Sequence, residues 1–147
     1  MMVCLGNICR SPLAHGVMEN MVKQAGLNWE IDSAGTGDWH IGCSPDKRSI
    51  EIAQSNGIDI TNQKAQLFNQ SFFTEYDQIL VMDKQNYADV IAMADSQQQR
   101  DKVSLFLVDD EVPDPYLDSN MFTYVFQLIE KRCKELIIEW KDNSINK

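Results

Sequence analysis

A short stretch near the N-terminus combines a cysteine, an arginine six positions later and a serine directly after it: Cys4, Arg10 and Ser11. A cysteine at the start of a helix and close to an arginine is favoured as a thiolate, so Cys4 is a candidate nucleophile. The planar guanidinium of Arg10 can donate two hydrogen bonds to two oxygens of one phosphate group. Ser11 is placed to donate its hydroxyl to the Cys4 sulfur and to stabilise a departing thiolate. These residues indicate nucleophilic attack on a phosphoryl group.

The residues around this cysteine are typical of a loop that joins a strand to a helix. Apolar residues 1–3 precede the loop. Apolar residues follow it at helical spacing, at Leu13, Val17, Met21 and Val22. Ser11 suits the N-cap of this helix and Pro12 suits its first position. Gly6 and Asn7 tolerate positive φ, which a tight loop needs if its N–H groups are to point inward. The loop and the helix dipole together predict an anion-binding cradle.

A second candidate for chemistry is Asp114, which lies between Pro113 and Pro115. Displacement at phosphorus needs an acid for the leaving oxygen and then a base for water, and one carboxyl group can serve in both steps. The two prolines fix the loop and remove two N–H donors that would otherwise engage the carboxylate. Alone, Asp-Pro is equally a turn signal, but together with the Cys4 loop it indicates a general acid. Neighbouring carboxylates are interpreted as solvated loop residues, namely Asp109, Asp110, Glu111 and Asp118.

Strands alternate with helices along the chain, and this order predicts the scaffold for the two loops. Strands are expected at residues 1–3, 29–34, 78–82 and 103–108. Helices are expected at residues 12–25, 46–55, 83–94 and 121–140, the third of them capped by Asp83. The assignment of residues 58–73 is left open, with room for a short strand and one helical turn. Residues 95–101 are expected to form a polar surface loop, and residues 141–147 to be frayed.

This alternation predicts an α/β fold in three layers, with a four-stranded parallel sheet covered by helices on both faces. Ligands of such sheets bind outside the carboxyl ends of the strands, where the strand order reverses. The Cys4 loop follows the first strand and the Asp114 loop follows the fourth, so both are expected at the same edge. A length of 147 residues suits a single domain, residues 1–147.

The composition argues against several kinds of partner. The formal charge is −9, with 13 Lys and Arg against 22 Asp and Glu, so neither nucleic acid nor an anionic membrane is expected to bind. The chain lacks an apolar run of about 18 residues and a signal-like start, which predicts a soluble cytoplasmic protein. Its four cysteines have no regular spacing and are expected to be reduced. A monomer is expected.

The stretch Val3-Cys4-Leu5-Gly6-Asn7-Ile8-Cys9-Arg10-Ser11-Pro12 resembles the phosphate loop of the low-molecular-weight protein tyrosine phosphatases. Later motifs match in the same order: Asp32-Ser33-Ala34-Gly35-Thr36, Trp39-His40-Ile41-Gly42, Val81-Met82-Asp83 and Val112-Pro113-Asp114-Pro115-Tyr116. The resemblance implies a flavodoxin-like fold and a phosphatase without metal or cofactor. Such an enzyme hydrolyses protein phosphotyrosine and small aryl phosphates through a phosphocysteine, and releases inorganic phosphate.

The resemblance also assigns roles along the loops. Cys4 attacks, Arg10 binds phosphoryl oxygens and Asp114 acts as acid and then base. The substrate-binding residues are Leu5, Gly6, Asn7, Ile8, Cys9, Ser11, Trp39 and Tyr116. Among them the walls of a slot deep enough for a phenyl phosphate are Leu5, Ile8, Trp39 and Tyr116. Some relatives with threonine at the position of Ile8 are phosphoarginine phosphatases, so isoleucine favours phosphotyrosine.

Among the remaining cysteines, Cys9 is a candidate for a redox role. In related enzymes a second loop cysteine captures the oxidised nucleophile, and the same is hypothesised for Cys4 and Cys9. Cys43 and Cys133 are interpreted as a loop residue and a core residue. A metal site of Cys4, Cys9 and His15 is disfavoured because no fourth ligand is in view.

Three positions depart from the family pattern. Relatives commonly have histidine and arginine where Gln63 and Gln66 fall, and that histidine helps to hold the loop asparagine. Asn7 is therefore expected to be held less rigidly. Leu117 stands where many relatives have a second aromatic residue, which puts the substrate wall in doubt.

Three other functions are open to the same loop. A thiol-linked arsenate reductase would need a relay of further cysteines, which Cys43 and Cys133 do not obviously provide. A phosphoarginine phosphatase would use the same nucleophile. A phosphate-binding or redox-sensing module without turnover would have no use for the complete set of Cys4, Arg10 and Asp114.

Overall fold

A four-stranded parallel sheet lies at the centre of the computed structural model, in which residues 1–145 are described. The strands are β1 (Met2–Cys4), β2 (Ser33–Gly35), β3 (Ile79–Val81) and β4 (Val103–Leu105), in the spatial order β2-β1-β3-β4. Val3 of β1 pairs with Ala34 on one side and with Val81 on the other. The order reverses at β1, so a crevice is expected at the carboxyl end of this strand.

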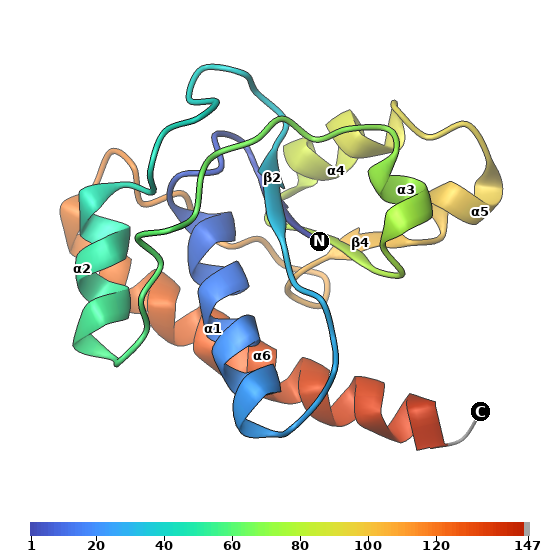
Figure 1. Ribbon diagram of the computed structural model, residues 1–147. Helices are drawn as coiled ribbons and strands as arrows, with labels where there is room; N and C mark the ends of the chain where they lie inside the picture. The colour runs from blue at the N-terminus through green and yellow to red at the C-terminus, as the bar shows by residue number, and fades with distance from the viewer. Residues whose placement is uncertain (146–147) are drawn as a thin grey trace.

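Helices cover both faces of the sheet (Figure 1). They are α1 (Arg10–Gln24), α2 (Lys47–Ser55), α3 (Phe72–Glu75), α4 (Lys84–Ile91), α5 (Gln97–Arg100), the 3₁₀ turn η1 (Ser119–Met121) and α6 (Phe122–Ile145). One apolar cluster joins α1, α2 and α6 to one face, and a second joins α3 and α4 to the other. The predicted three-layer α/β fold is confirmed.

The two apolar clusters follow from the two-residue period of the strands. Met2 and Cys4 of β1 belong to the cluster under α1 and α6, whereas Met1 and Val3 belong to the opposite one. All four side chains are buried, as both faces of a parallel sheet require. A fully buried valine or methionine side chain stabilises the fold by roughly 1.5–3 kcal/mol. The end of β1 is therefore a firm support for the loop that follows.

Three of the strands are shorter than the sequence suggested, and the first covers Met2–Cys4 instead of residues 1–3. The predicted strand at residues 29–34 is paired only over Ser33–Gly35. Trp29 packs instead edge-on against Trp140, with ring centres 5.8 Å apart. The predicted strands at residues 78–82 and 103–108 likewise shorten to Ile79–Val81 and Val103–Leu105, because only these residues pair with each other in the sheet.

The prediction for the start of α1 was wrong. The helix begins at Arg10 and its N-cap residue is Cys9, which makes no side-chain cap hydrogen bond. Ser11 is therefore inside the helix rather than its cap. Pro12 is the third helical residue and is still within the first turn, where the missing N–H has no intrahelical partner to lose.

Other boundaries also differ. The predicted loop at residues 95–101 contains the single turn α5, capped by Ser96, whose Oγ accepts from Gln99 N at 3.2 Å. The ambiguous residues 58–73 contain one isolated bridge, between Gly35 and Leu67, and the start of the turn α3. Helix α6 continues to Ile145 through most of the tail that was expected to fray, and residues 146–147 of that prediction lie outside the described residues.

Within residues 1–145, every helix is too short or too polar to cross a bilayer. A cytoplasmic location stays a prediction.

Candidate active site

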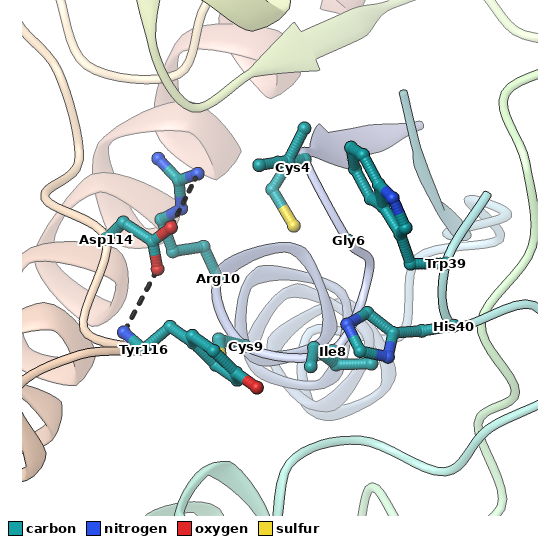
Figure 2. A pocket seen from close by; sticks show the side chains of 10 residues that line it. Cys4, Gly6, Ile8, Cys9, Arg10, Trp39, His40, Asp114 and Tyr116 are labelled. Atoms are coloured by element: carbon teal, nitrogen blue, oxygen red, sulfur yellow. Dashed lines mark hydrogen bonds and ion pairs between the residues drawn. The ribbon is translucent and has the colours of Figure 1, made fainter. Parts of the chain in front are cut away.

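The site lies at the carboxyl edge of the sheet, where the loop after β1 meets the loop after β4. A cavity of about 130 Å³ opens there. It is lined by Cys4, Leu5, Gly6, Ile8, Cys9, Arg10, Trp39, His40, Asp114 and Tyr116. Figure 2 shows the Cys4 sulfur between Arg10 and Asp114 on one side and Trp39 and His40 on the other.

Cys4 is the last residue of β1 and is buried at the floor of the cavity. Its Sγ lies 3.0 Å from Ser11 Oγ and accepts the Asn7 N–H at 3.3 Å. The start of α1 lies directly behind it, with the positive end of the helix dipole. These are the contacts that a thiolate accepts. The sequence placed the Ser11 hydroxyl at this sulfur, and the structure shows that contact.

Asn7 fixes the shape of the loop. It has φ of 56°, as the sequence suggested. Its Nδ2 donates to Ser11 Oγ at 2.8 Å and to Ser33 Oγ at 3.0 Å, and its Oδ1 accepts from Gln66 N at 3.0 Å. The side chain is buried, so these bonds satisfy groups that burial would otherwise leave unpaired. Asn7 thus joins the loop to β2 and to residue 66.

The interpretation of Gly6 was wrong. Its φ is not positive, unlike that of Asn7. A Cβ at position 6 would lie 3.1 Å from Cδ2 of His40, tighter than most real contacts. Glycine lets the His40 ring pack this closely on the loop, and a larger residue would require the ring to shift by a few tenths of an ångström.

Arg10 is 3% exposed and is held by the loops after β3 and β4. Its Nη1 donates to Asp83 Oδ2 at 2.7 Å and to the Val112 carbonyl at 3.0 Å. Burial acts to lower the pKa of Arg10, but the negative charge of Cys4 and the hydrogen bond to Asp83 outweigh it and raise the pKa above its usual value. The guanidinium stays charged and its plane is fixed.

The sequence predicted Asp83 only as a helix cap, and it has two functions. Its Oδ1 accepts from Asn86 N at 2.8 Å and caps α4, as expected. Its other oxygen holds Arg10. In the sequence, the feature that pointed to this second contact was the match of Val81-Met82-Asp83 to a family motif.

Asp114 reaches the cavity from the opposite loop and its side chain is 46% exposed. Its Oδ1 accepts from Tyr116 N at 3.1 Å, and its Oδ2 lies 3.7 Å from Arg10 Nη2. The structure therefore brings Cys4, Arg10 and Asp114 around one cavity, with the carboxylate accessible to solvent.

Apolar side chains surround the mouth. Trp39 is 68% exposed and Leu5 and Tyr116 are also exposed, while Ile8 is half-buried. The Trp39 ring lies directly over Gly37, where a Cβ would fall 1.9 Å from a ring carbon, so only glycine allows this position. His40 was missed by the sequence analysis, although it follows Trp39 in a motif that was recognised.

Gln63 was expected to hold Asn7 in place of a histidine, but the contacts of Gln63 and Gln66 are different. Gln63 Nε2 donates to the Pro12 carbonyl at 3.1 Å, away from Asn7. The main-chain N–H of Gln66 holds Asn7 Oδ1, and its side chain donates to the Ser33 carbonyl at 2.9 Å. Asn7 is thus held by a backbone group, which no side-chain pattern predicts.

Leu117 and His15 both lie outside the lining of the cavity. Leu117 is 94% exposed. His15 Nδ1 lies 3.1 Å from Ser33 Oγ, and its other ring nitrogen faces Glu19.

The four cysteines are free. Cys9 is buried, and burial, reinforced by nearby negative charges, raises its pKa to about 12. Cys133 is buried in the cluster under α6 and Cys43 is exposed in its loop, as the sequence suggested. Across residues 1–145, no three side chains of His, Cys, Asp or Glu are grouped to hold a metal ion.

The fold and the cavity together define a class of protein. In this class a cysteine at the end of the first strand and an arginine at the start of the first helix lie at the two ends of one loop, and a carboxylate faces them from a later loop of a parallel α/β fold.

Comparisons with known proteins identify the family within this class. The model of the family described as low molecular weight phosphotyrosine protein phosphatase matches residues 1–147. The low molecular weight protein-tyrosine-phosphatase YfkJ of Bacillus subtilis is 37% identical over 142 residues, which cover 92% of this chain and 90% of that protein. The low molecular weight phosphotyrosine protein phosphatase of Sus scrofa is 33% identical over 144 residues, with 92% and 90% covered.

A solved structure agrees with these relatives. The crystal structure of a protein tyrosine phosphatase from Entamoeba histolytica with Hepes in the active site has a TM-score of 0.90 and 32% identity, and the match covers 97% of this chain and 96% of that one. The chain belongs to the low molecular weight phosphotyrosine protein phosphatase family, and the relatives named here are phosphatases of tyrosine-phosphorylated protein.

Proposed function

We propose that this protein is a metal-independent phosphatase that hydrolyses phosphotyrosine in proteins, and small aryl phosphates, through a phosphocysteine on Cys4. One observation carries the proposal: the Cys4 sulfur accepts the Asn7 N–H and contacts the Ser11 hydroxyl at the floor of a cavity that Arg10 and Asp114 also line. Nucleophile, phosphate-binding cation and acid are thus all within reach of one phosphoryl group.

In the first step the Cys4 thiolate attacks phosphorus. An S–P bond forms and the bond from phosphorus to the phenolic oxygen breaks. Asp114, in its protonated form, gives its proton to that oxygen, so that a neutral phenol leaves. Arg10 and the N–H groups at the start of α1 neutralise charge on the phosphoryl oxygens, where a low dielectric strengthens the interaction.

In the second step a water molecule attacks the phosphocysteine. The Asp114 carboxylate takes a proton from the water as the new O–P bond forms. The S–P bond breaks, and the departing Cys4 thiolate is stabilised by Ser11 and by the Asn7 N–H. Inorganic phosphate leaves and Asp114 is again protonated.

The shape of the mouth supports an aryl substrate. Trp39 and Tyr116 stand at the rim and Ile8 contributes an apolar wall, so a phenyl ring between the rim and the floor is in contact with apolar atoms. A phosphoserine has no atoms to fill this space.

The alternative functions are not favoured. An arsenate reductase needs a relay of accessible cysteines, but Cys133 lies in the core and Cys43 is exposed in a separate loop. Asp114 would also have no task there. Isoleucine at position 8 disfavours a phosphoarginine phosphatase.

Hydrolysis of p-nitrophenyl phosphate in the presence of EDTA tests the proposal. The wild type is expected to turn over and Cys4→Ser to be inactive. Asp114→Ala is expected to lose about 100-fold or more in kcat, because the second step needs its carboxylate as a base even where the leaving group needs no proton. A tyrosine-phosphorylated peptide is expected to react and its phosphoserine counterpart not. An inactive wild type, or Cys4→Ser with its rate intact, would overturn the proposal.

A further inference from the structure

Asp46 and Arg48, at the start of α2, form a closely bonded ion pair. Asp46 is the N-cap residue, and its Oδ1 accepts from Arg48 N at 2.8 Å. The Arg48 side chain donates back to both oxygens of the same carboxylate, from Nε at 3.0 Å and from Nη2 at 2.9 Å. The hydrogen bonds from Arg48 hold the pKa of Asp46 below its usual range. The pair is therefore charged at neutral pH.

This pair is attached to the Cys4 loop through the backbone. Asp46 N donates to the Ile8 carbonyl at 2.7 Å. Ser49, one turn further along α2, donates from Oγ to the Cys9 carbonyl at 3.3 Å. The start of α2 is thus fixed relative to residues 8 and 9 of the phosphate loop.

The same arginine also reaches the loop that carries Asp114. Arg48 Nη2 donates to the Tyr116 carbonyl at 3.0 Å and Nη1 to Ser119 Oγ at 3.0 Å. Its guanidinium carbon lies 4.6 Å from the ring centre of Phe122 and 5.7 Å from that of Tyr116. In Figure 1 the segment before α6 runs beside α2, in agreement with these contacts.

A single residue, Tyr116, links Arg48 to the acid. The Tyr116 carbonyl accepts from Arg48, while the Tyr116 N–H donates to Asp114 Oδ1. On the other side of Asp114, the Val112 carbonyl accepts from Arg10 Nη1. An arginine therefore holds the main chain on each side of the exposed carboxylate.

We propose that Arg48, fixed by Asp46, is a positioning residue that sets the place of Asp114 over the Cys4 loop for proton transfer to the leaving group. This inference rests on the phosphatase function proposed above. The planar fork of arginine is needed because its three nitrogens bind both oxygens of Asp46, the Tyr116 carbonyl and Ser119 Oγ at the same time, a geometry that the single nitrogen of lysine cannot reproduce. A displacement of an acid by about 1 Å can cost about 100-fold in rate.

The test is the dependence of kcat/KM on the leaving group. Nitrophenolate leaves readily without a proton, whereas phenolate needs one. Arg48→Met is expected to lower kcat/KM for phenyl phosphate by about 10-fold and for p-nitrophenyl phosphate by about 2-fold or less. Arg48→Lys, which keeps the charge, is expected to show the same selective loss and carries the test if Arg48→Met does not fold. In an Asp114→Ala background, Arg48→Met is expected to cause no further selective loss.

Arg132 provides the matched control. It also links a helix to a loop, because its Nε donates to the Phe106 carbonyl at 2.7 Å and its Nη1 pairs with Glu135. Arg132→Met is expected to lower the melting temperature without any dependence on the leaving group. Equal losses on the two substrates in Arg48→Met, or a selective loss that persists in Asp114→Ala, would overturn this proposal alone. An inactive wild type would overturn the proposed function and this proposal with it.

Discussion

The two loops of the site are built in opposite ways. The loop from Cys4 to Arg10 is largely buried. Within it, the single side chain of Asn7 makes hydrogen bonds to Ser11, Ser33 and Gln66. The loop around Asp114 is largely exposed and is held mainly through its backbone, by Arg10 and Arg48. The nucleophile and phosphate cradle are thus preorganised, whereas the acid depends on a few anchors at its flanks.

This difference indicates how changes in each loop will act. A substitution in the buried loop removes hydrogen bonds inside the protein and costs stability as well as rate. A substitution in the exposed loop leaves the fold intact and changes mainly one chemical step or the binding of one part of the substrate. The difference is tested most directly by paired substitutions in the two loops.

The largest effect is expected for Asn7→Ala. It removes three side-chain hydrogen bonds and places alanine at a φ of 56°. We expect kcat/KM for p-nitrophenyl phosphate to fall by about 100-fold and the free energy of unfolding by about 2 kcal/mol or more. Steady-state kinetics and urea denaturation measure the two effects.

Asp109 is the matched control, because it also has a positive φ, of 53°, but lies in the exposed loop. Asp109→Ala is expected to cost about 1 kcal/mol or less and to leave kcat/KM unchanged. Equal effects of the two substitutions would show that the buried network has no special part in the site.

Ser11→Ala is expected to have a smaller effect on rate. It removes the hydroxyl 3.0 Å from the Cys4 sulfur and leaves Asn7 bound to Ser33. We expect kcat to fall by about 10-fold, since the thiolate is then less stabilised as a leaving group, with little change in KM. A rise in KM at constant kcat would instead assign Ser11 to phosphate binding.

At the rim, Trp39→Ala is expected to raise KM for aryl phosphates by about 3- to 10-fold with little change in kcat or melting temperature, because the ring is largely exposed. Leu117→Ala is the control, since Leu117 is even more exposed and lies outside the cavity lining. If Leu117→Ala raises KM as much as Trp39→Ala, the wall extends beyond the cavity.

The smallest effect concerns recovery from oxidation. Peroxide converts the Cys4 thiolate to a sulfenic acid, and attack by Cys9 would then release water and form a disulfide that dithiothreitol reverses. Because burial raises the pKa of Cys9 to about 12, its thiolate is scarce at pH 7 and becomes more abundant as the pH rises. We expect the fraction of activity recovered to increase from pH 7 to pH 9 in the wild type. Cys9→Ser should show no such increase, and irreversible loss in both proteins would reject the disulfide.

Local sequence patterns predicted the elements and the chemistry of the buried loop better than its detailed contacts. The positive φ of Asn7 and the contact between Ser11 and Cys4 follow from residue type and spacing. The same rules misplaced the start of α1, because a serine that suits an N-cap is used here for the sulfur and for Asn7.

Long-range contacts were beyond local patterns. Asp83 reaches Arg10 across 73 positions, and the contact follows from the adjacency of β1 and β3 in the sheet. Arg48 meets Tyr116 across 68 positions through the packing of α2 beside the Asp114 loop. Both depend on strand order and helix packing rather than on any pattern within one segment.

The most direct test of the account is to locate the covalent intermediate. The wild type, mixed with excess p-nitrophenyl phosphate and quenched rapidly in acid, is digested and mapped by mass spectrometry. The account predicts a phosphoryl group on Cys4, absent in Cys4→Ser. A phosphoryl group on another residue, or turnover with no phosphoenzyme, would contradict the assignment of Cys4 as the nucleophile.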